Sequence, residues 1–304
     1  MSENYLVYGA NGGQGGAVVR ALLARDKRVR VLARDPERSV FRGDARVEIV
    51  PGDLDDSDSL RRASAGVTGV YLMMPLSFDY ERTSRWGRNA IDAASASQAS
   101  LLVFNTSGLQ LDDAVGLASF DQKLELRRYL EQASIPSITL NGTLYMDNLT
   151  APWSAPGIVH QGVVAYPLPA EMRVSWISWE EAAAYAVAAL ERPDLAARKT
   201  ALQLGGVEAL TGTQLAAILA RVLRKSIRYV DLPLAQLELG LNQAFGPPAG
   251  TELAANYAWL ARPRERSPLD VDLTRARAEL PVPQRRFEDW ARDVPWTVLS
   301  GAAP

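Results

Sequence analysis

The chain has 304 residues, of which 47% are hydrophobic and 22% are charged, a composition typical of globular proteins. Its lack of cysteine excludes disulfides and thiol nucleophiles. The chain has a single histidine, His160, which excludes a histidine-rich metal site and argues against a Ser/His/Asp triad. A net charge of −2 provides no overall basic field for nucleic acid, and no apolar run approaches the roughly 18 to 20 residues of a membrane span. We therefore expect no metal, no nucleic-acid partner and no membrane association. Because the N-terminal residues lack the pattern of a secretory signal, we also expect a cytoplasmic location.

Short apolar runs bounded by turn residues alternate with helical patterns through the first half of the chain. The runs expected to form strands are Tyr5–Tyr8, Val29–Leu32, Val47–Val50, Val70–Met73, Leu101–Phe104 and Ser137–Leu140. Successive strands joined through helices pair in parallel, because a parallel pair needs a long crossover connection. The pattern therefore predicts an α/β fold with a Rossmann-type, doubly wound parallel sheet.

After about residue 150 the pattern becomes less regular. A stretch with prolines and tryptophan, Ala151–Pro169, precedes a short expected strand, Arg173–Ile177, and an expected helix, Trp179–Glu191. The apolar run Ala201–Leu204 is typical of one more buried strand. Thr211 is placed to cap a following helix with a single apolar face.

Two further helical patterns surround Leu234–Gln243 and Thr251–Ala261. We therefore predict a smaller, mostly helical lobe beside the larger α/β domain. The larger domain is expected to comprise residues 1–150, with 170–206 returning to it, and the smaller lobe to comprise residues 151–169 and 207–304.

The segment Gly9–Gly16 contains the pattern G-x-x-G-x-x-G between the first expected strand and the first amphipathic helix. In such a loop Gly9 allows a tight turn, Gly12 lets the backbone approach a pyrophosphate, and Gly15 lets helix and strand pack closely. The helix N-terminus adds unpaired N–H groups and the positive end of the helix dipole. A glycine-rich turn without a ligand is the alternative, but the strand, loop and helix together favour a dinucleotide site.

The residue after the second strand indicates which dinucleotide is bound. NAD-specific proteins usually hold a carboxylate there, whereas NADP-specific proteins hold a cation against the 2′-phosphate. Arg34 occupies this position and can pair bidentately with a phosphate, and Arg38 lies one turn later as a second cation. Asp35 must then point away, and a solvated surface arginine is the alternative. Asp53, after the third strand, either reaches the adenine edge or only terminates its strand. We predict NADP(H) as the cofactor.

Several segments spread over nearly the whole chain carry a family resemblance. They are YGANGGQGGAVVRALL, VRVLARDP with VEIVPGDLDD, FDQKLELRRYLEQASIPSITLNGTLYMDN, WISWEEAAAYAVAALERP and LTRARAELPVPQRRFEDWARD. Together they resemble the NmrA-like group of atypical short-chain dehydrogenases/reductases. The resemblance implies that Arg34 takes the 2′-phosphate and that Lys123 lies near the nicotinamide ribose. It also implies that the diphosphate is surrounded by Gly9, Asn11, Gly12, Gln14 and Gly15, and we add the adjoining Gly13 to this set.

Two departures from the related dehydrogenases concern the catalytic groups. The orthodox enzymes use Tyr-x-x-x-Lys, and the tyrosine position is Ser119 here, so the usual proton relay is missing. Ser119 and Lys123 are one helical turn apart and share a face, although a solvated helix lysine is the alternative for Lys123. The segment Asn141-Gly142-Thr143 also replaces the Arg-Pro-Gly of the family, in the loop that would cover the nicotinamide.

Tyr145 is the best substitute proton donor, because it follows the end of the sixth strand, where ligands of open α/β sheets bind. A core aromatic residue is its alternative role. Water can also supply the proton when the acceptor is easily reduced. Met74 and Pro75 are expected beside the nicotinamide, and together with Phe78, Tyr145 and Trp153 they would contact an apolar acceptor.

Two hypotheses of function follow from these observations. The first is an NADPH-dependent reductase of a small apolar acceptor such as a quinone, imine or enone. The second is a non-catalytic NADP(H) redox sensor that binds a protein partner, and the missing tyrosine favours it. The sequence leaves the acceptor, the partner and the choice between monomer and homodimer open.

Overall fold

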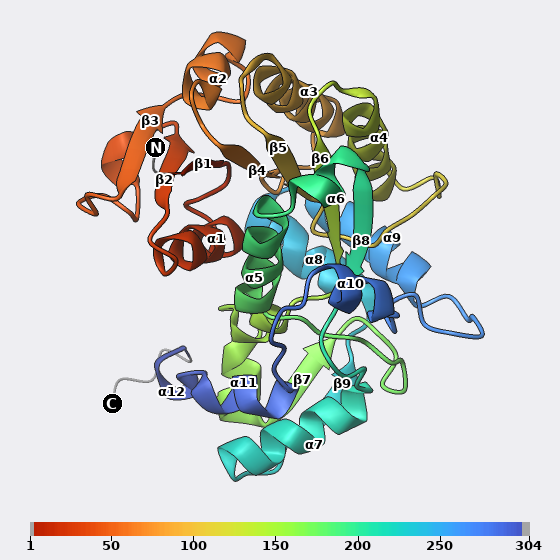
Figure 1. Ribbon diagram of the computed structural model, residues 1–304. Coiled ribbons are helices and arrows are strands. Elements are labelled where there is room, and N and C mark those ends of the chain that lie inside the picture. The colour runs from red at the N-terminus through yellow and green to blue at the C-terminus, as the bar shows by residue number, and fades with distance from the viewer. Residues whose placement is uncertain (1–2, 300–304) are drawn as a thin grey trace. The chain divides into compact units, whose positions relative to one another are not determined.

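A computed structural model describes residues 3–299 of the chain (Figure 1). The chain divides into two compact units. Unit 1 comprises Met1–Gly142, Trp179–Gln203 and Thr274–Val282, and unit 2 comprises Thr143–Ser178, Leu204–Leu273 and Pro283–Pro304. These bounds differ from the expected ones at residues 143–150, 170–178 and 204–206, which fall in unit 2, and at 274–282, which fall in unit 1. Local sequence patterns do not reveal these exchanges, because the unit to which a short segment belongs depends on its long-range contacts.

Unit 1 is built on a seven-stranded sheet with the order β3-β2-β1-β4-β5-β6-β8. The pairs β1–β2, β1–β4, β2–β3, β4–β5 and β5–β6 are all parallel, as predicted. The strands are β1 (Asn4–Val7), β2 (Arg28–Ala33), β3 (Val47–Pro51), β4 (Gly69–Met73), β5 (Leu101–Asn105), β6 (Ser137–Gly142) and β8 (Thr200–Leu204). Strand order reverses between β1 and β4, and this reversal marks the point where ligands of doubly wound sheets bind.

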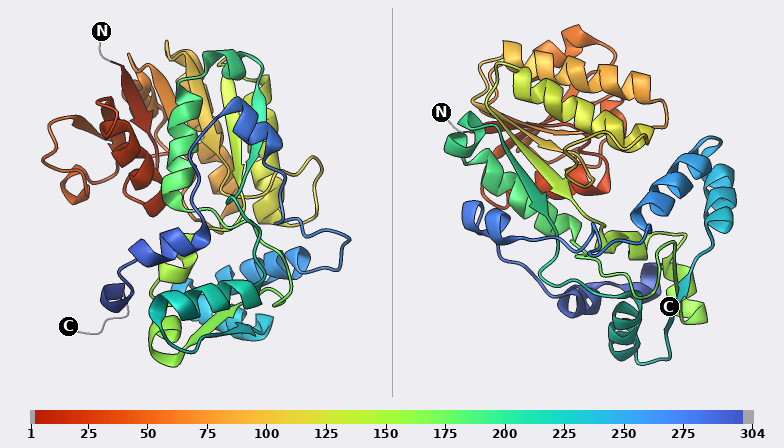
Figure 2. Two further views of the ribbon diagram at one scale, coloured as in Figure 1. Left: turned by 60° about the horizontal axis from the view of Figure 1, so that its bottom comes forward. Right: turned by 90° about the vertical axis from the view of Figure 1, so that its right-hand side faces the viewer.

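Helices cover both faces of this sheet. The helices α1 (Gly13–Leu23) and α5 (Trp179–Leu190) pack together on one face (Figure 2). On the other face lie α2 (Ser57–Ser64), α3 (Tyr80–Ala96) and α4 (Ala118–Gln132). The shorter elements of unit 1 are η1 (Pro36–Arg38), α6 (Pro193–Ala197) and α10 (Thr274–Glu279).

The main core of unit 1 lies between the sheet and helices α2, α3 and α4. Strand residues Leu6, Leu102 and Phe104 meet Ile91 of α3 and Leu126 of α4 there, and all five are almost fully buried. Strands covered on both faces become apolar along their whole length, which explains why the sequence pattern located them. All five residues of β5 are buried accordingly.

Unit 2 contains a two-stranded parallel sheet of β7 (Val163–Tyr166) and β9 (Arg228–Asp231) that the sequence pattern did not predict. The expected strand at Arg173–Ile177 is wrong. This segment forms only isolated bridges, Val174 with Leu210 and Ile177 with Tyr145, because no neighbouring run extends the pairing.

The remaining elements of unit 2 are helical. The cap predicted at Thr211 is confirmed, since its side chain accepts from the Gln214 N–H and the Gln214 side chain bonds back to the Thr211 backbone. The helices are η2 (Met146–Thr150), η3 (Gly157–Gln161), α7 (Gly212–Leu223), α8 (Leu234–Phe245), α9 (Ala249–Leu260), α11 (Phe287–Asp293) and α12 (Trp296–Leu299).

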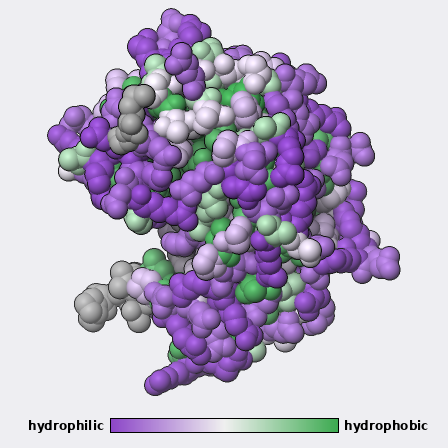
Figure 3. Space-filling model, viewed as in Figure 1, coloured by the Kyte–Doolittle hydropathy of each residue, from purple (hydrophilic) through white to green (hydrophobic). Residues whose placement is uncertain are grey.

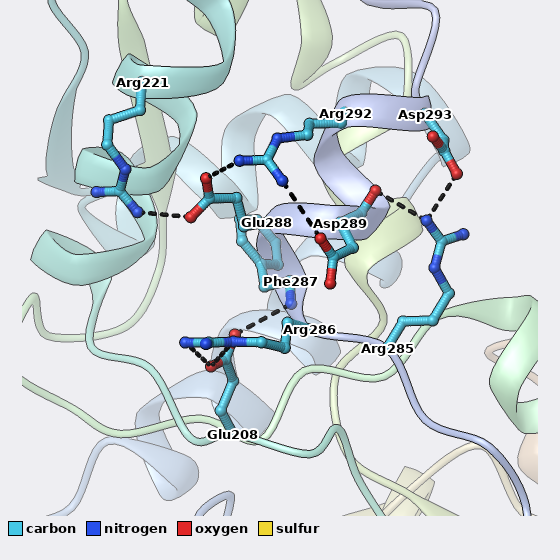
Figure 4. Close-up of polar contacts among 9 residues, drawn as sticks. All are labelled: Glu208, Arg221, Arg285, Arg286, Phe287, Glu288, Asp289, Arg292 and Asp293. Carbon is cyan, nitrogen blue, oxygen red and sulfur yellow. Dashed lines mark hydrogen bonds and ion pairs between the residues drawn. The ribbon is translucent and has the colours of Figure 1, made fainter.

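Ion pairs join α11 to α7 and to the loop before α7 (Figure 4). Arg221 of α7 lies 2.8 Å from the Glu288 carboxylate of α11, and Glu288 also pairs with Arg292. At the start of α11, the Glu208 carboxylate accepts from the Phe287 N–H at 3.1 Å and pairs with Arg286. These arginines are therefore engaged in local structure.

On the face shown in Figure 3, hydrophilic residues predominate and hydrophobic ones form small patches. Among residues 3–299, no helix combines the length and the hydropathy needed to cross a bilayer.

Candidate dinucleotide and acceptor site

The loop between β1 and α1 adopts a conformation that requires glycine at several positions. Gly9 has a φ of +72°, and its carbonyl oxygen accepts from the Gly12 N–H at 3.0 Å. A Cβ at Gly15 would lie 2.2 Å from the Gly9 carbonyl oxygen, and one at Gly13 would lie 2.1 Å from the ring of Trp179. The glycines thus allow α1 to begin directly against β1 and α5.

The first turn of α1 offers unpaired donors. The first helical hydrogen bond joins the Gly16 N–H to the Gly12 carbonyl oxygen at 2.8 Å. The N–H groups of Gly13, Gln14 and Gly15 precede this bond and have no acceptor within the helix. Gly12 is the N-cap residue, and it has no side chain that could accept from them. Together with the helix dipole, they form a site suited to an anion such as a pyrophosphate.

Two exposed cations lie close by in the chain, after β2. Arg34 immediately follows β2, and Arg38 ends η1. Within residues 3–299, neither side chain has an ion pair or a hydrogen bond to another described residue. The Asp35 carboxylate accepts from the Glu37 N–H at 3.1 Å, so it caps η1 instead of pairing with Arg34. This orientation leaves both guanidinium groups available to a phosphate.

Asn11 links the glycine loop to the segment that carries these arginines. Its Oδ1 accepts from the Ser39 Oγ at 3.2 Å and from the Val40 N–H at 3.4 Å. Asn11 therefore holds the end of η1 beside the glycine loop.

A polar cluster connects the start of α1 with the end of β5. Gln14 donates through Nε2 to the Ser107 Oγ at 3.0 Å and accepts from the Asn105 Nδ2 at 3.2 Å. Asn105 Nδ2 also donates to the Tyr71 hydroxyl at 3.0 Å. Asn105 and Ser107 were not predicted as site residues, although their position at and directly after the end of a buried parallel strand was a usable signal.

Lys123 of α4 joins this cluster. Its Nζ donates to the Ser107 carbonyl oxygen at 3.0 Å, and desolvation by burial lowers the pKa of the amine to about 8. A Cβ at Gly108 would lie 2.9 Å from the same Nζ, so a larger residue there would displace the amine. Lys123 is thus turned toward the end of β5, and Ser119 lies one turn earlier on the same helix.

Three further predicted residues follow β3 and β4. Asp53 accepts from the Asp55 N–H at 2.9 Å, and its own N–H donates to the Ser59 Oγ at 3.1 Å, so it stabilises the turn before α2. Met74 and Pro75 follow β4 and are partly to fully exposed. Because β1, β3, β4 and β5 run parallel, these residues lie at the same edge of the sheet as the glycine loop.

Trp153 and Tyr145 belong to unit 2, whereas the other predicted site residues belong to unit 1. Tyr145 precedes η2, is 6% exposed and forms a parallel bridge with Ile177. The structure therefore unites the glycine loop, the arginines and Lys123 within one unit, but it does not include Tyr145 in that group.

The sequence profile of the NmrA-like family matches residues 1–291. The chain belongs to this family. The NmrA-like chain is 31% identical over 291 residues to the (4-alkanoyl-5-oxo-2,5-dihydrofuran-3-yl)methyl phosphate reductase of Streptomyces griseus, covering 95% of this chain and 96% of that protein.

Two other proteins resemble this NmrA-like chain at lower identity. The NAD(P)H azoreductase of Xenophilus azovorans is 27% identical over 268 residues, which are 85% of this chain and 87% of that protein. The NADPH-dependent quinone oxidoreductase of Escherichia coli, solved with NADPH, has a TM-score of 0.73 at 20% identity and covers 94% of this chain and 98% of its own. The structural likeness establishes the shared fold.

Proposed function

We propose that the protein is an NADPH-dependent reductase of a small, apolar, conjugated acceptor. The observation that carries the proposal is the edge of unit 1 where parallel strands β1, β2 and β5 end. The N–H groups at the start of α1, two arginines without a partner among residues 3–299 and the Ser107–Lys123 cluster follow these strands. One group of donors suits a pyrophosphate, the second a phosphate, and the third a ribose.

The arginines support NADPH rather than NADH. A guanidinium hydrogen-bonded to phosphate forms a charge-assisted contact worth about 1.5 to 3 kcal/mol, or roughly 10- to 100-fold in affinity. Arg34 and Arg38 have no described carboxylate partner to release first, so this affinity is not reduced by a broken ion pair.

Lys123 and Ser107 orient the reacting end of the dinucleotide in this proposal. The Lys123 ammonium has donors beyond the one directed at the Ser107 carbonyl, and these suit ribose hydroxyls. When bound, the cofactor supplies the hydride. Serine is a far weaker acid than the tyrosine of the orthodox enzymes, so Ser119 does not replace it as a proton donor.

The acceptor class follows from this missing proton relay. Hydride addition without an enzymic acid is feasible when the negative charge that develops is delocalised, as in quinones and enones. The names of the Streptomyces, Xenophilus and Escherichia relatives describe reductases of a dihydrofuranone phosphate, of azo compounds and of quinones, and these names support the same class.

NADPH consumption against a panel of quinones, enones, imines and azo dyes tests the proposal. We expect turnover of at least one conjugated acceptor and tighter binding of NADPH than of NADH in fluorescence titration. Inactivity on the whole panel would contradict the reductase function, and equal affinity for the two nucleotides would contradict the role of the arginines.

The serine at position 119, where the orthodox enzymes have tyrosine, supports a second candidate function, a non-catalytic NADP(H) sensor that binds a protein partner. Bound NADP(H) can change the affinity for a partner only if it contacts two conformational states of the protein differently. Capture of a partner that depends on NADPH, combined with an inactive acceptor panel, would favour the sensor. Capture that is indifferent to NADPH would remove it.

A further inference from the structure

Unit 2 contains a cavity of about 340 Å³ that is lined by residues of two segments, 169–173 and 261–270. Its volume lies within the range of about 300 to 1,000 Å³ that is usual for small-molecule pockets. Four arginines and three carboxylates line the cavity, so the net charge of its lining is +1. They are Arg173, Arg262, Arg264 and Arg266, and Glu171, Glu265 and Asp270. The hollow is therefore a candidate site for an anion.

Two of the three carboxylates are engaged by neighbouring side chains. The Asp270 carboxylate accepts from the Arg173 Nε at 3.1 Å and from the Arg266 Nη2 at 3.3 Å. The Glu171 carboxylate accepts from the Thr213 hydroxyl at 3.2 Å. A guanidinium carries five N–H groups, and each of these two arginines uses a single nitrogen for Asp270. Both therefore keep donors for a second anion.

The other two arginines also have free donors. The Arg264 Nη1 donates to the carbonyl oxygens of Trp259 and Leu260 at 2.9 and 3.2 Å, at the C-terminal end of α9. The Arg264 Cζ lies 4.3 Å from the centroid of the Trp259 ring, so stacking also holds this guanidinium in place. Its Nε and Nη2 have no acceptor among residues 3–299. Within the same range, the Arg262 side chain has no ion pair or hydrogen bond, so its whole guanidinium is available.

The loop of residues 261–270 is anchored to the rest of unit 2. The Ser175 N–H donates to the Leu269 carbonyl oxygen at 2.8 Å, and Leu269 is only 1% exposed. Pro263 and Pro268 restrict the backbone of the loop further. A restricted loop loses less conformational freedom when a ligand binds, so its arginines are partly preorganised.

We propose that this cavity, here called the arginine pocket, binds the phosphate group of a small organic phosphate monoester. Such a group carries about −1.5 to −2 charges at pH 7 and three terminal oxygens, and guanidinium groups match its geometry with paired hydrogen bonds. Its oxygens can accept from arginines of both segments at once, whereas a carboxylate offers only two oxygens. The organic part of the ligand would contact the apolar lining, Pro169, Met172, Pro263 and Pro268. The inference goes beyond the proposed reductase function and uses residues of unit 2 alone.

Glu265 allows a test of opposite sign. It lines the arginine pocket, is exposed and has no partner among residues 3–299, so its carboxylate repels an anion. Glu265→Gln removes this negative charge and should strengthen binding, whereas Arg262→Ala removes a positive charge and should weaken it. Because neither side chain has a described partner, we expect both variants to fold, and circular dichroism checks this.

Arg228 provides the matched control for Arg262. It is an exposed arginine of β9 in unit 2, and its side chain also has no partner within residues 3–299. It does not line the arginine pocket. Arg228→Ala therefore removes the same charge from the surface of unit 2 without changing the proposed site.

The experiment titrates phenyl phosphate into the full chain by calorimetry, with one equivalent of NADP+ present to occupy the dinucleotide site. We expect one phenyl phosphate to bind, and Arg262→Ala to weaken its affinity by about 10-fold, the loss of a charge-assisted hydrogen bond. Glu265→Gln should strengthen the affinity by about 2- to 5-fold, because one repelling charge is lost. Arg228→Ala should leave it unchanged, and benzoate should bind at least about 10-fold more weakly than phenyl phosphate.

Four results would overturn the inference. The first is no binding of phenyl phosphate to the wild type, and the second is equal binding of benzoate. The third is an equal loss in Arg262→Ala and Arg228→Ala, which would indicate general attraction to surface charge. The fourth is a loss of affinity in Arg34→Ala with none in Arg262→Ala, which would assign the phosphate to the dinucleotide site.

Discussion

Exposed arginines occur in two settings that differ in their partners. Around α7 and α11, Arg221, Arg286 and Arg292 each pair with a carboxylate (Figure 4). After β2, Arg34 and Arg38 are also exposed, but neither has a described partner. All five side chains are exposed arginines, so the presence or absence of a neighbouring carboxylate decides whether the guanidinium is paired. Paired arginines hold elements together, whereas unpaired ones beside a bare helix N-terminus leave positive charge for a ligand.

The largest effect is expected from a methyl group in the glycine loop. Gly15→Ala places a Cβ 2.2 Å from the Gly9 carbonyl oxygen, so α1 must move away from the anion site. We expect affinity for NADPH to fall by more than about 100-fold in fluorescence titration, because the helix N–H groups lose their alignment. Gly240→Ala is the control, since no atom lies within 4 Å of its Cβ. A folded Gly15→Ala protein with wild-type affinity would refute the site.

The next effect sharpens the comparison between the two arginine settings. Arg34→Ala should weaken NADPH binding by about 10- to 100-fold and leave NADH binding nearly unchanged, because only NADPH carries the 2′-phosphate. Arg286→Ala, which breaks the pair with Glu208, should change neither affinity. Equal losses for NADPH and NADH in Arg34→Ala would mean that Arg34 does not contact the extra phosphate.

Two lysines, Lys123 without an ion-pair partner among residues 3–299 and Lys27 with one, should differ in how they make stability depend on pH. Burial lowers the pKa of Lys123 to about 8, so the charged amine destabilises the folded state below pH 8, and this penalty disappears as the pH rises toward the unfolded value. Lys123→Met should therefore gain stability relative to the wild type at pH 7. The difference in free energy of unfolding between Lys123→Met and the wild type should decrease by about 1 to 2 kcal/mol between pH 7 and pH 9.5, as measured by urea unfolding.

Lys27 is the paired control for this measurement. Its hydrogen bond with Glu3 raises the pKa of Lys27, so the stabilisation is fully present below about pH 10.4 and is lost only at higher pH. The difference between Lys27→Met and the wild type should be constant from pH 7 to pH 9.5. A sloping difference for Lys27, or a flat one for Lys123, would contradict these assignments.

The smallest effect concerns the paired arginines. Arg221→Gln should lower the free energy of unfolding by less than about 1 kcal/mol, and the difference should decrease in high salt. Arg221 is the main cause of the lowered pKa of Glu288, so this stabilisation is present above the usual pKa of a glutamate and is lost as the pH falls through the lowered value. A pH-independent difference would show that charge is not the cause.

The sheet of unit 1 was predictable because each of its strands is a local apolar run. The strand patterns of β1 to β6 and β8 are confirmed, since burial on both faces imprints a continuous apolar pattern. Strands β7 and β9 were missed because each has only four residues and pairs with a partner more than 60 residues away. The expected strand at Arg173–Ile177 had suitable residues but lacks a continuous partner.

The candidate site divides in the same way. The sequence alone predicted the glycine loop and the cations after β2, because backbone freedom and charge are local properties, and the family resemblance pointed to Lys123 of α4. Only the tertiary structure decided that Asp35 turns away from Arg34, that Gln14 meets Ser107, and that Arg173 and Asp270 of the arginine pocket meet. The latter two contacts join residues more than 90 positions apart. Their existence depends on how the chain closes long loops, which no local pattern encodes.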